Sequence, residues 1–139
     1  MTGGGETQRW LEDAWDRAEA AVVLVGGDDA GPLAGRRLLA EVYDDDALAE
    51  LRELTTSGAF TGDICRCHGS LTVALLDAGG DFIGGGSCHG RDTVSWERGR
   101  FRDDLEVADP EGLSAFLHRY GVPWPAAAPA GGVGSPRVT

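Results

Sequence analysis

The chain has 139 residues, and 42% of them are hydrophobic, which is enough apolar material for one ordinary domain with a core. Its net charge of −11 argues against nucleic acid and anionic membrane surfaces as partners, because both need clustered positive charge. No apolar run approaches the ~20 residues of a membrane helix, and the N-terminus has no apolar signal segment. We therefore expect a cytoplasmic protein.

The first quarter of the chain predicts a helix followed by a strand. Residues 1–6 are rich in glycine and are expected to be flexible. From Thr7 the apolar residues, Trp10 and Trp15 among them, recur at helical spacing and form one stripe. "AVVLV", Ala21–Val25, is rich in β-branched residues, so we predict a strand there.

A second strand and a second helix are expected next. "RLLAEVY", Arg37–Tyr43, has the composition of a strand, and the acidic run Asp44–Asp46 follows it. Carboxylates favour a helix N-terminus both as caps and through the helix dipole, so these residues predict the start of a helix. The segment "TTSGAFTGD" is expected to be the loop that leaves this helix.

The second half of the chain predicts an antiparallel sheet and a last helix. Four strands are expected, two of them as a hairpin around "DAGGD", over residues 70–77, 81–87, 93–96 and 100–107. Asp109 is placed to cap the last helix, Pro110 occupies its first position, and Gly121 lies just beyond its end.

These elements predict a single α+β domain over residues 7–122. Consecutive strands with short turns imply an antiparallel β-sheet, of about four to six strands, with three helices packed on one face. Residues 123–139 form a Pro/Ala/Gly-rich tail that is expected to be disordered, with Trp124 as the residue able to fold back onto the body.

The hairpin region carries the residues that suggest chemistry. The tripeptide "CHG" occurs at Cys67-His68-Gly69 and again at Cys88-His89-Gly90, on either side of the predicted turn. A three-residue loop, which the turn residues favour, places Leu71 opposite Ser87 and puts Cys65, Cys67 and His89 on one face. A loop of two or four residues shifts the pairing by one, so that His68 and His89 share one face and all three cysteines take the other.

The first hypothesis is a transition-metal site. Thiolate and imidazole ligands together suit zinc, and also Cu(I) or Fe. The expected ligands are Cys65, Cys67 and His89, with Cys88 or His68 as a fourth ligand or as a group that supports one of the ligands. Three protein ligands would leave an open coordination position, which is the pattern of catalytic zinc. We expect an accessory or regulatory role for such a protein.

Two other hypotheses stay open. Cys65 and Cys67 could form an easily reduced disulfide, which would indicate a thiol redox or thiol-sensing protein. Alternatively, the cysteines are buried small hydrophobes and the domain is a metal-free protein-interaction module. Arg66 and Arg91 could bind a small anion, although scattered solvated arginines explain them as well. None of the common hydrolase, zinc-protease or dinucleotide-binding motifs is present.

The combination of Cys65-x-Cys67, a hairpin, His89-Gly90 and Trp96 resembles a pattern of uncharacterised bacterial proteins, C-x-C, hairpin, H-H-G and W. The resemblance covers roughly residues 37–122 and implies an α+β module. Cys88 stands where that pattern has its first histidine, and the resemblance implies no activity.

Overall fold

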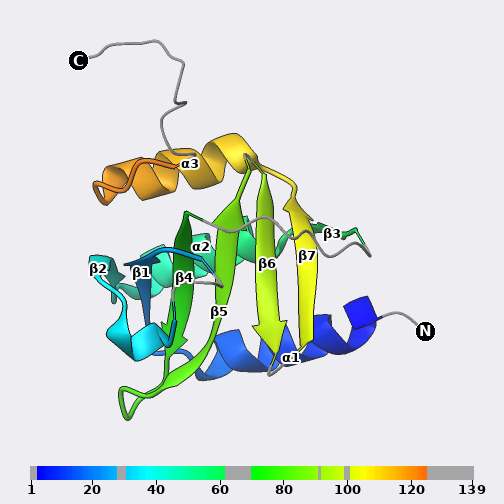
Figure 1. Ribbon diagram of the computed structural model, residues 1–139, viewed down its shortest axis with the longest axis horizontal. Helices are drawn as coiled ribbons and strands as arrows, with labels where there is room; N and C mark the ends of the chain where they lie inside the picture. The colour runs from blue at the N-terminus through cyan, green and yellow to red at the C-terminus, as the bar shows by residue number, and fades with distance from the viewer. Residues whose placement is uncertain (1–2, 28–30, 62–69, 91, 99–100, 125–139) are drawn as a thin grey trace.

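The computed structural model describes residues 3–27, 31–61, 70–90, 92–98 and 101–124. In these residues it has three α-helices, a short 3-10 helix and one antiparallel sheet (Figure 1). The elements in chain order are α1 (Gly3–Arg17), β1 (Ala20–Val25), η1 (Leu33–Gly35), β2 (Leu38–Val42), α2 (Asp45–Thr56), β3 (Gly58–Phe60), β4 (Leu71–Leu76), β5 (Phe82–His89), β6 (Thr93–Arg98), β7 (Phe101–Val107) and α3 (Pro110–Arg119).

The sheet has seven strands in the order β2-β1-β4-β5-β6-β7-β3, and each neighbouring pair is antiparallel. The predicted α+β class and its three helices are therefore confirmed. The predicted number of strands, four to six, is too low by at least one.

The additional strand is β3, which lies inside the segment predicted as a loop. Its three residues pair with β7, with Gly58 opposite Val107 and Phe60 opposite Leu105. Gly58 has φ +150°, and a Cβ there would lie 2.0 Å from the backbone oxygen of Glu106. Gly58 is required here because the two backbones lie so close together. A strand of three residues is also too short to show the alternation of apolar and polar residues by which a sequence reveals a strand.

All three helices pack on one face of the sheet. One core cluster joins buried residues of the helices to those of the strands, among them Trp15, Leu51, Phe116, Val73, Trp96 and Leu105. The Trp96 indole donates a hydrogen bond from Nε1 to the Thr55 backbone oxygen at 3.0 Å, which ties β6 to α2. The opposite face of the sheet is therefore the one that the helices leave uncovered.

The predicted helix starts hold for α2 and α3. Asp44 accepts a hydrogen bond from the Ala47 backbone N–H at 3.0 Å, and Asp109 accepts one from the Gly112 N–H at 3.0 Å. These caps satisfy backbone donors that have no partner within the helix. Helix α1 differs, since it begins at Gly3 instead of Thr7.

The β4–β5 hairpin has the predicted turn. The Asp77 N–H donates to the Asp81 backbone oxygen at 2.9 Å, which closes a three-residue loop. The Asp77 carboxylate also accepts hydrogen bonds from the backbone N–H groups of Gly79 and Asp81. The turn residues therefore specify the loop, as expected from their chemistry.

The register along the hairpin arms is not the one that we preferred. The pairing shifts between Leu75 and Leu76, and beyond this irregularity Leu71 faces Cys88 and not Ser87. An extra residue in one strand shifts the pairing of every later residue by one position. Residues that would have shared a face then lie on opposite faces. This part of the hairpin therefore has the alternative register of the sequence analysis, in which Cys88 lies on the face of Leu71 and His89 on the opposite face. The segment with Cys65, Cys67 and His68 lies outside the described residues.

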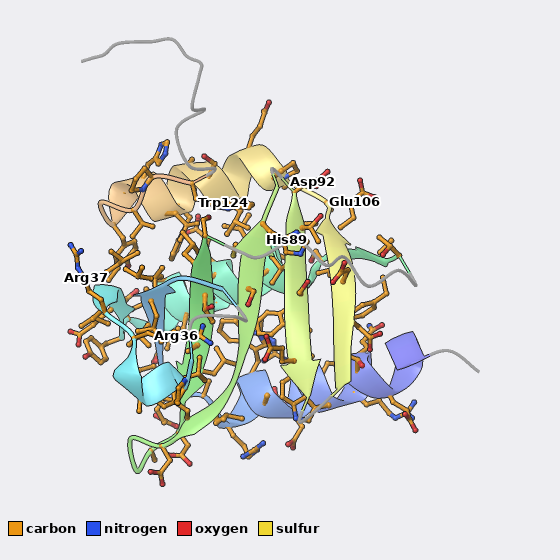
Figure 2. All side chains as sticks on the ribbon, viewed as in Figure 1. Arg36, Arg37, His89, Asp92, Glu106 and Trp124 are labelled. Carbon is orange, nitrogen blue, oxygen red and sulfur yellow. The ribbon has the colours of Figure 1, made fainter. Side chains whose placement is uncertain are left out.

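The folded body extends past residue 122. The side chain of Trp124 is fully buried, and the Ser114 hydroxyl donates a hydrogen bond to the Trp124 backbone oxygen. Trp124 therefore packs back onto the domain beside α3 (Figure 2). Residues 125–139 of the predicted tail lie outside the described residues.

Candidate functional site

A row of buried polar side chains crosses β5, β6 and β7 on the face away from the helices. Ser95 of β6 lies directly opposite Asp104 of β7, and His89 lies at the end of β5. His89 Nε2 is 2.8 Å from Ser95 Oγ, and the Ser95 hydroxyl donates a short hydrogen bond to Asp104 Oδ1. These three residues are called the relay below, and Figure 2 shows His89 at the same end of the sheet as Asp92 and Glu106.

The direction of the Ser95 hydrogen bond fixes the tautomer of His89. A hydroxyl has one proton, and Ser95 gives it to the Asp104 carboxylate. Ser95 Oγ must therefore accept from His89, so the imidazole proton is on Nε2. In the neutral imidazole Nδ1 then carries the lone pair, and no described residue makes a hydrogen bond to it. That nitrogen can bind a metal ion or accept a proton.

The relay is shielded from water. The exposed fractions are 8% for His89, 2% for Ser95 and 4% for Asp104. Hydrogen bonds between buried groups are stronger than those in water, and a network whose members are all satisfied holds its side chains in one orientation. The arrangement therefore fixes the direction in which the His89 ring presents Nδ1.

A second hydroxyl on the same face has no hydrogen-bond partner among the described residues. Ser87 lies opposite Ser95 on one side and opposite Thr72 on the other, and it is 2% exposed. In the part of the chain that the structure describes, its Oγ makes no hydrogen bond. Buried polar groups are nearly always paired with protein or water. This hydroxyl therefore has capacity to bond a water or a ligand next to the relay.

Cys88 points the opposite way from its neighbour His89. It is fully buried among apolar residues of the helix-covered core, including Leu71 and Val94. Burial raises the pKa of the Cys88 thiol to about 12. A thiol in such surroundings stays protonated near neutral pH, and the thiolate is the form that binds metals. Cys88 is therefore a core residue.

The other predicted site residues lie outside the described part of the chain. These are Cys65, Arg66, Cys67, His68 and Arg91. The ends of the segment 62–69 are placed, however. The Thr61 N–H donates to the Asp104 backbone oxygen, and the Ser70 N–H donates to the Cys88 backbone oxygen, both at 3.0 Å. In the described residues alone, no group of three or more His, Cys, Asp or Glu side chains could hold a metal ion.

The sequence does not single out Ser95 or Asp104, which form the relay with His89. A serine in "TVSW" and an aspartate in "RFRDDLEV" carry no motif of their own. Their alignment comes from the β6–β7 pairing, in which Arg98 faces Phe101. No motif in either strand specifies this register, so the sequence carries no signal for the pair Ser95 and Asp104.

The order of the relay excludes one tempting interpretation. In serine hydrolases the histidine lies between the serine and the carboxylate and removes the serine proton. Here Ser95 lies between His89 and Asp104 and is buried. Ser95 is therefore a positioning residue for the imidazole.

Comparison of the chain with family models, with curated proteins and with solved structures found no match. Among the described helices, none combines the length and the apolar character needed to cross a bilayer.

Proposed function

We propose that this protein binds one transition-metal ion, zinc first, with His89 Nδ1 and the thiolates of Cys65 and Cys67 as ligands. The observation that carries the proposal is the relay, which fixes the proton of His89 on Nε2 and leaves Nδ1 able to coordinate. The role proposed for the protein is accessory or regulatory.

The relay resembles the hydrogen-bonding arrangement that orients a metal-binding histidine. A histidine that binds a metal usually donates its other ring N–H to a carboxylate, a carbonyl or a water, and this bond sets the tautomer and the ring orientation. Ser95 supplies the acceptor here, and Asp104 lies behind it. The negative carboxylate favours positive charge on the imidazole side, which is what coordination to a cation produces.

The residues on either side of the segment that carries the two cysteines are held at neighbouring strands of the sheet. Segment 62–69 starts beside Asp104 and ends beside Cys88, through the hydrogen bonds of Thr61 and Ser70. Three peptide units separate Cys67 from Ser70, so their Cα atoms are at most about 11 Å apart. The two backbone oxygens that accept these hydrogen bonds belong to β7 and β5, which also carry Asp104 and His89 of the relay. The proposal requires the chain to leave the register of Leu71 and Cys88 before it reaches the cysteines, because that register continued would put His68 on the face of His89 and the thiols on the other. Thiolates that reach His89 complete a sulfur-nitrogen set, which suits zinc and also Cu(I) or Fe.

Metal content tests the proposal. The full chain, purified without a histidine tag and under reducing conditions, is expected to contain or to take up about one equivalent of zinc per chain. The substitution His89→Ala should remove that binding, as should Cys65→Ser or Cys67→Ser. A cobalt-loaded sample should show the intense visible absorption of a tetrahedral site with sulfur ligands.

The chain offers matched controls. His118 is an exposed histidine in the last turn of α3, so His118→Ala should keep the full metal content. Cys88→Ala removes a buried thiol on the other face and should also keep it. Metal-free protein that takes up no ion, or equal metal content in His89→Ala and His118→Ala, would overturn the proposal.

A further inference from the structure

The strand β2 forms one edge of the sheet and carries an unusual amount of exposed apolar surface. It pairs with β1 on one side, and the sheet order places no described strand on its other side. Leu38 is 48% exposed, Leu39 is 37% exposed and Tyr43, just beyond the strand, is 60% exposed. Edge strands with exposed apolar residues are templates for pairing with another chain.

The two ends of β2 carry opposite charges. Arg36 and Arg37 precede the strand, and the acidic run Asp44–Asp46 follows it. Arg36 is held within its own chain by the Gly31 backbone oxygen and the Thr72 hydroxyl. Arg37 is exposed, and Figure 2 shows it at the β2 side of the molecule, directed away from the sheet. The edge is therefore basic at one end and acidic at the other.

This charge pattern is complementary to itself. In an antiparallel pair of two β2 strands, the basic end of each copy lies beside the acidic end of the other. A parallel pair would bring like charges together, which is destabilising. Centring the pair on Ala40 puts Leu38 opposite Val42 and leaves Arg37 near Asp44 and Asp45 of the other copy. Centring it on Glu41 would place two glutamates face to face.

We infer that β2 pairs antiparallel with β2 of a second copy of this chain, about a two-fold axis at Ala40. The contact is isologous, so each favourable pair occurs twice and the assembly closes as a dimer. The two sheets join into one, and the helices of both copies lie on the same side of it. This inference does not depend on the metal proposal, because β2 lies at the far side of β1 and β4 from the relay.

The test is sedimentation velocity of the full chain over a range of concentrations, with reductant and chelator present so that neither thiols nor metals link the copies. The expected result is a monomer–dimer equilibrium. Leu39→Asp places a carboxylate opposite Glu41 of the other copy and should weaken the dimer at least tenfold, which is about 1.4 kcal/mol.

Phe82→Asp is the matched control. Phe82 is 38% exposed, close to the 37% of Leu39, and it lies on β5 away from the β2 edge. Phe82→Asp should leave the dimer unchanged. Circular dichroism and an unchanged unfolding midpoint establish that each variant is folded.

A charge exchange tests the orientation of the two strands. Arg37→Glu should weaken the dimer, because it brings like charges together. Adding Asp45→Arg should restore it, because residue 37 of one copy and residue 45 of the other then carry opposite charges again. A protein that sediments as a monomer at every concentration would overturn the inference. Equal effects of Leu39→Asp and Phe82→Asp, or a double variant no better than Arg37→Glu, would overturn it as well.

Discussion

Ser95 is bonded to two buried polar groups, whereas its cross-strand neighbour Ser87 is bonded to none. Ser95→Ala leaves the His89 N–H and the Asp104 carboxylate without their shared partner. We expect the free energy of unfolding to fall by about 1–3 kcal/mol, since a buried group that loses its partner keeps its desolvation cost. Urea denaturation measures this change.

Ser87→Ala is the control for that substitution, because both serines are 2% exposed and lie opposite each other. Its hydroxyl makes no hydrogen bond with any residue that the structure describes. Removing it should change the free energy of unfolding by less than about 1 kcal/mol. Equal losses in Ser87→Ala and Ser95→Ala would contradict the assigned hydrogen bonds.

The thiol of Cys88 should be unreactive in the folded protein. Its pKa is raised to about 12 by burial, so the reactive thiolate is scarce at neutral pH. In a variant with Cys65→Ser and Cys67→Ser, labelling of Cys88 by a maleimide should require unfolding. Because the folded pKa lies above the unfolded one, the stabilising effect of the protonated thiol is complete below the unfolded pKa and is lost as the pH rises towards 12. Rapid labelling of the folded variant at neutral pH would contradict this assignment.

At the scale of elements, β5 contains three consecutive glycines, which weaken a strand unless close packing requires them. Two tryptophan rings lie against this surface. A Cβ on Gly84 would lie 2.8 Å from the Trp10 ring, and one on Gly86 would lie 2.7 Å from Val94 and 3.0 Å from Trp96. The glycines leave this part of β5 without side chains, so that the aromatic rings can pack directly against its backbone.

Gly86→Ala should therefore destabilise the fold, because Val94 and Trp96 are fully buried and have no room to move. We expect a loss of about 1–3 kcal/mol, the usual cost of an extra methyl group in a packed core. Gly35→Ala is the control, since nothing lies within 4 Å of its added Cβ. Thermal unfolding of both variants checks the difference, and a Gly86→Ala protein as stable as Gly35→Ala would contradict the packing.

The same hairpin shows what local sequence can and cannot specify. Asp77 and the glycines determine the turn, because their hydrogen bonds and backbone freedom act within a few residues. The register of the arms depends on the irregularity at Leu75 and Leu76, where the core accepts one residue more on β5. The hydrogen bonds of the turn do not reach this irregularity, so the residues that determine the turn do not determine the register of the arms.

For the whole molecule, the order of helices and strands was predictable because caps, turns and alternating patterns are local signals. The exception is β3, which forms a strand by pairing with β7 at the end of the sheet. Of the three relay residues, only His89 was predicted as a site residue. Ser95 and Asp104 reach it through the pairing of three strands, which combines residues that are distant along the chain.

The imidazole of His89 gives the most direct test of metal binding. Nitrogen-15 NMR of the histidine rings, with and without zinc, reports which nitrogen carries the proton and which binds the ion. We predict that Nε2 of His89 stays protonated in both samples and that the Nδ1 resonance alone moves when one equivalent of zinc is added. A protonated Nδ1 in the free protein, or a His89 spectrum that zinc leaves unchanged, would contradict the proposed site.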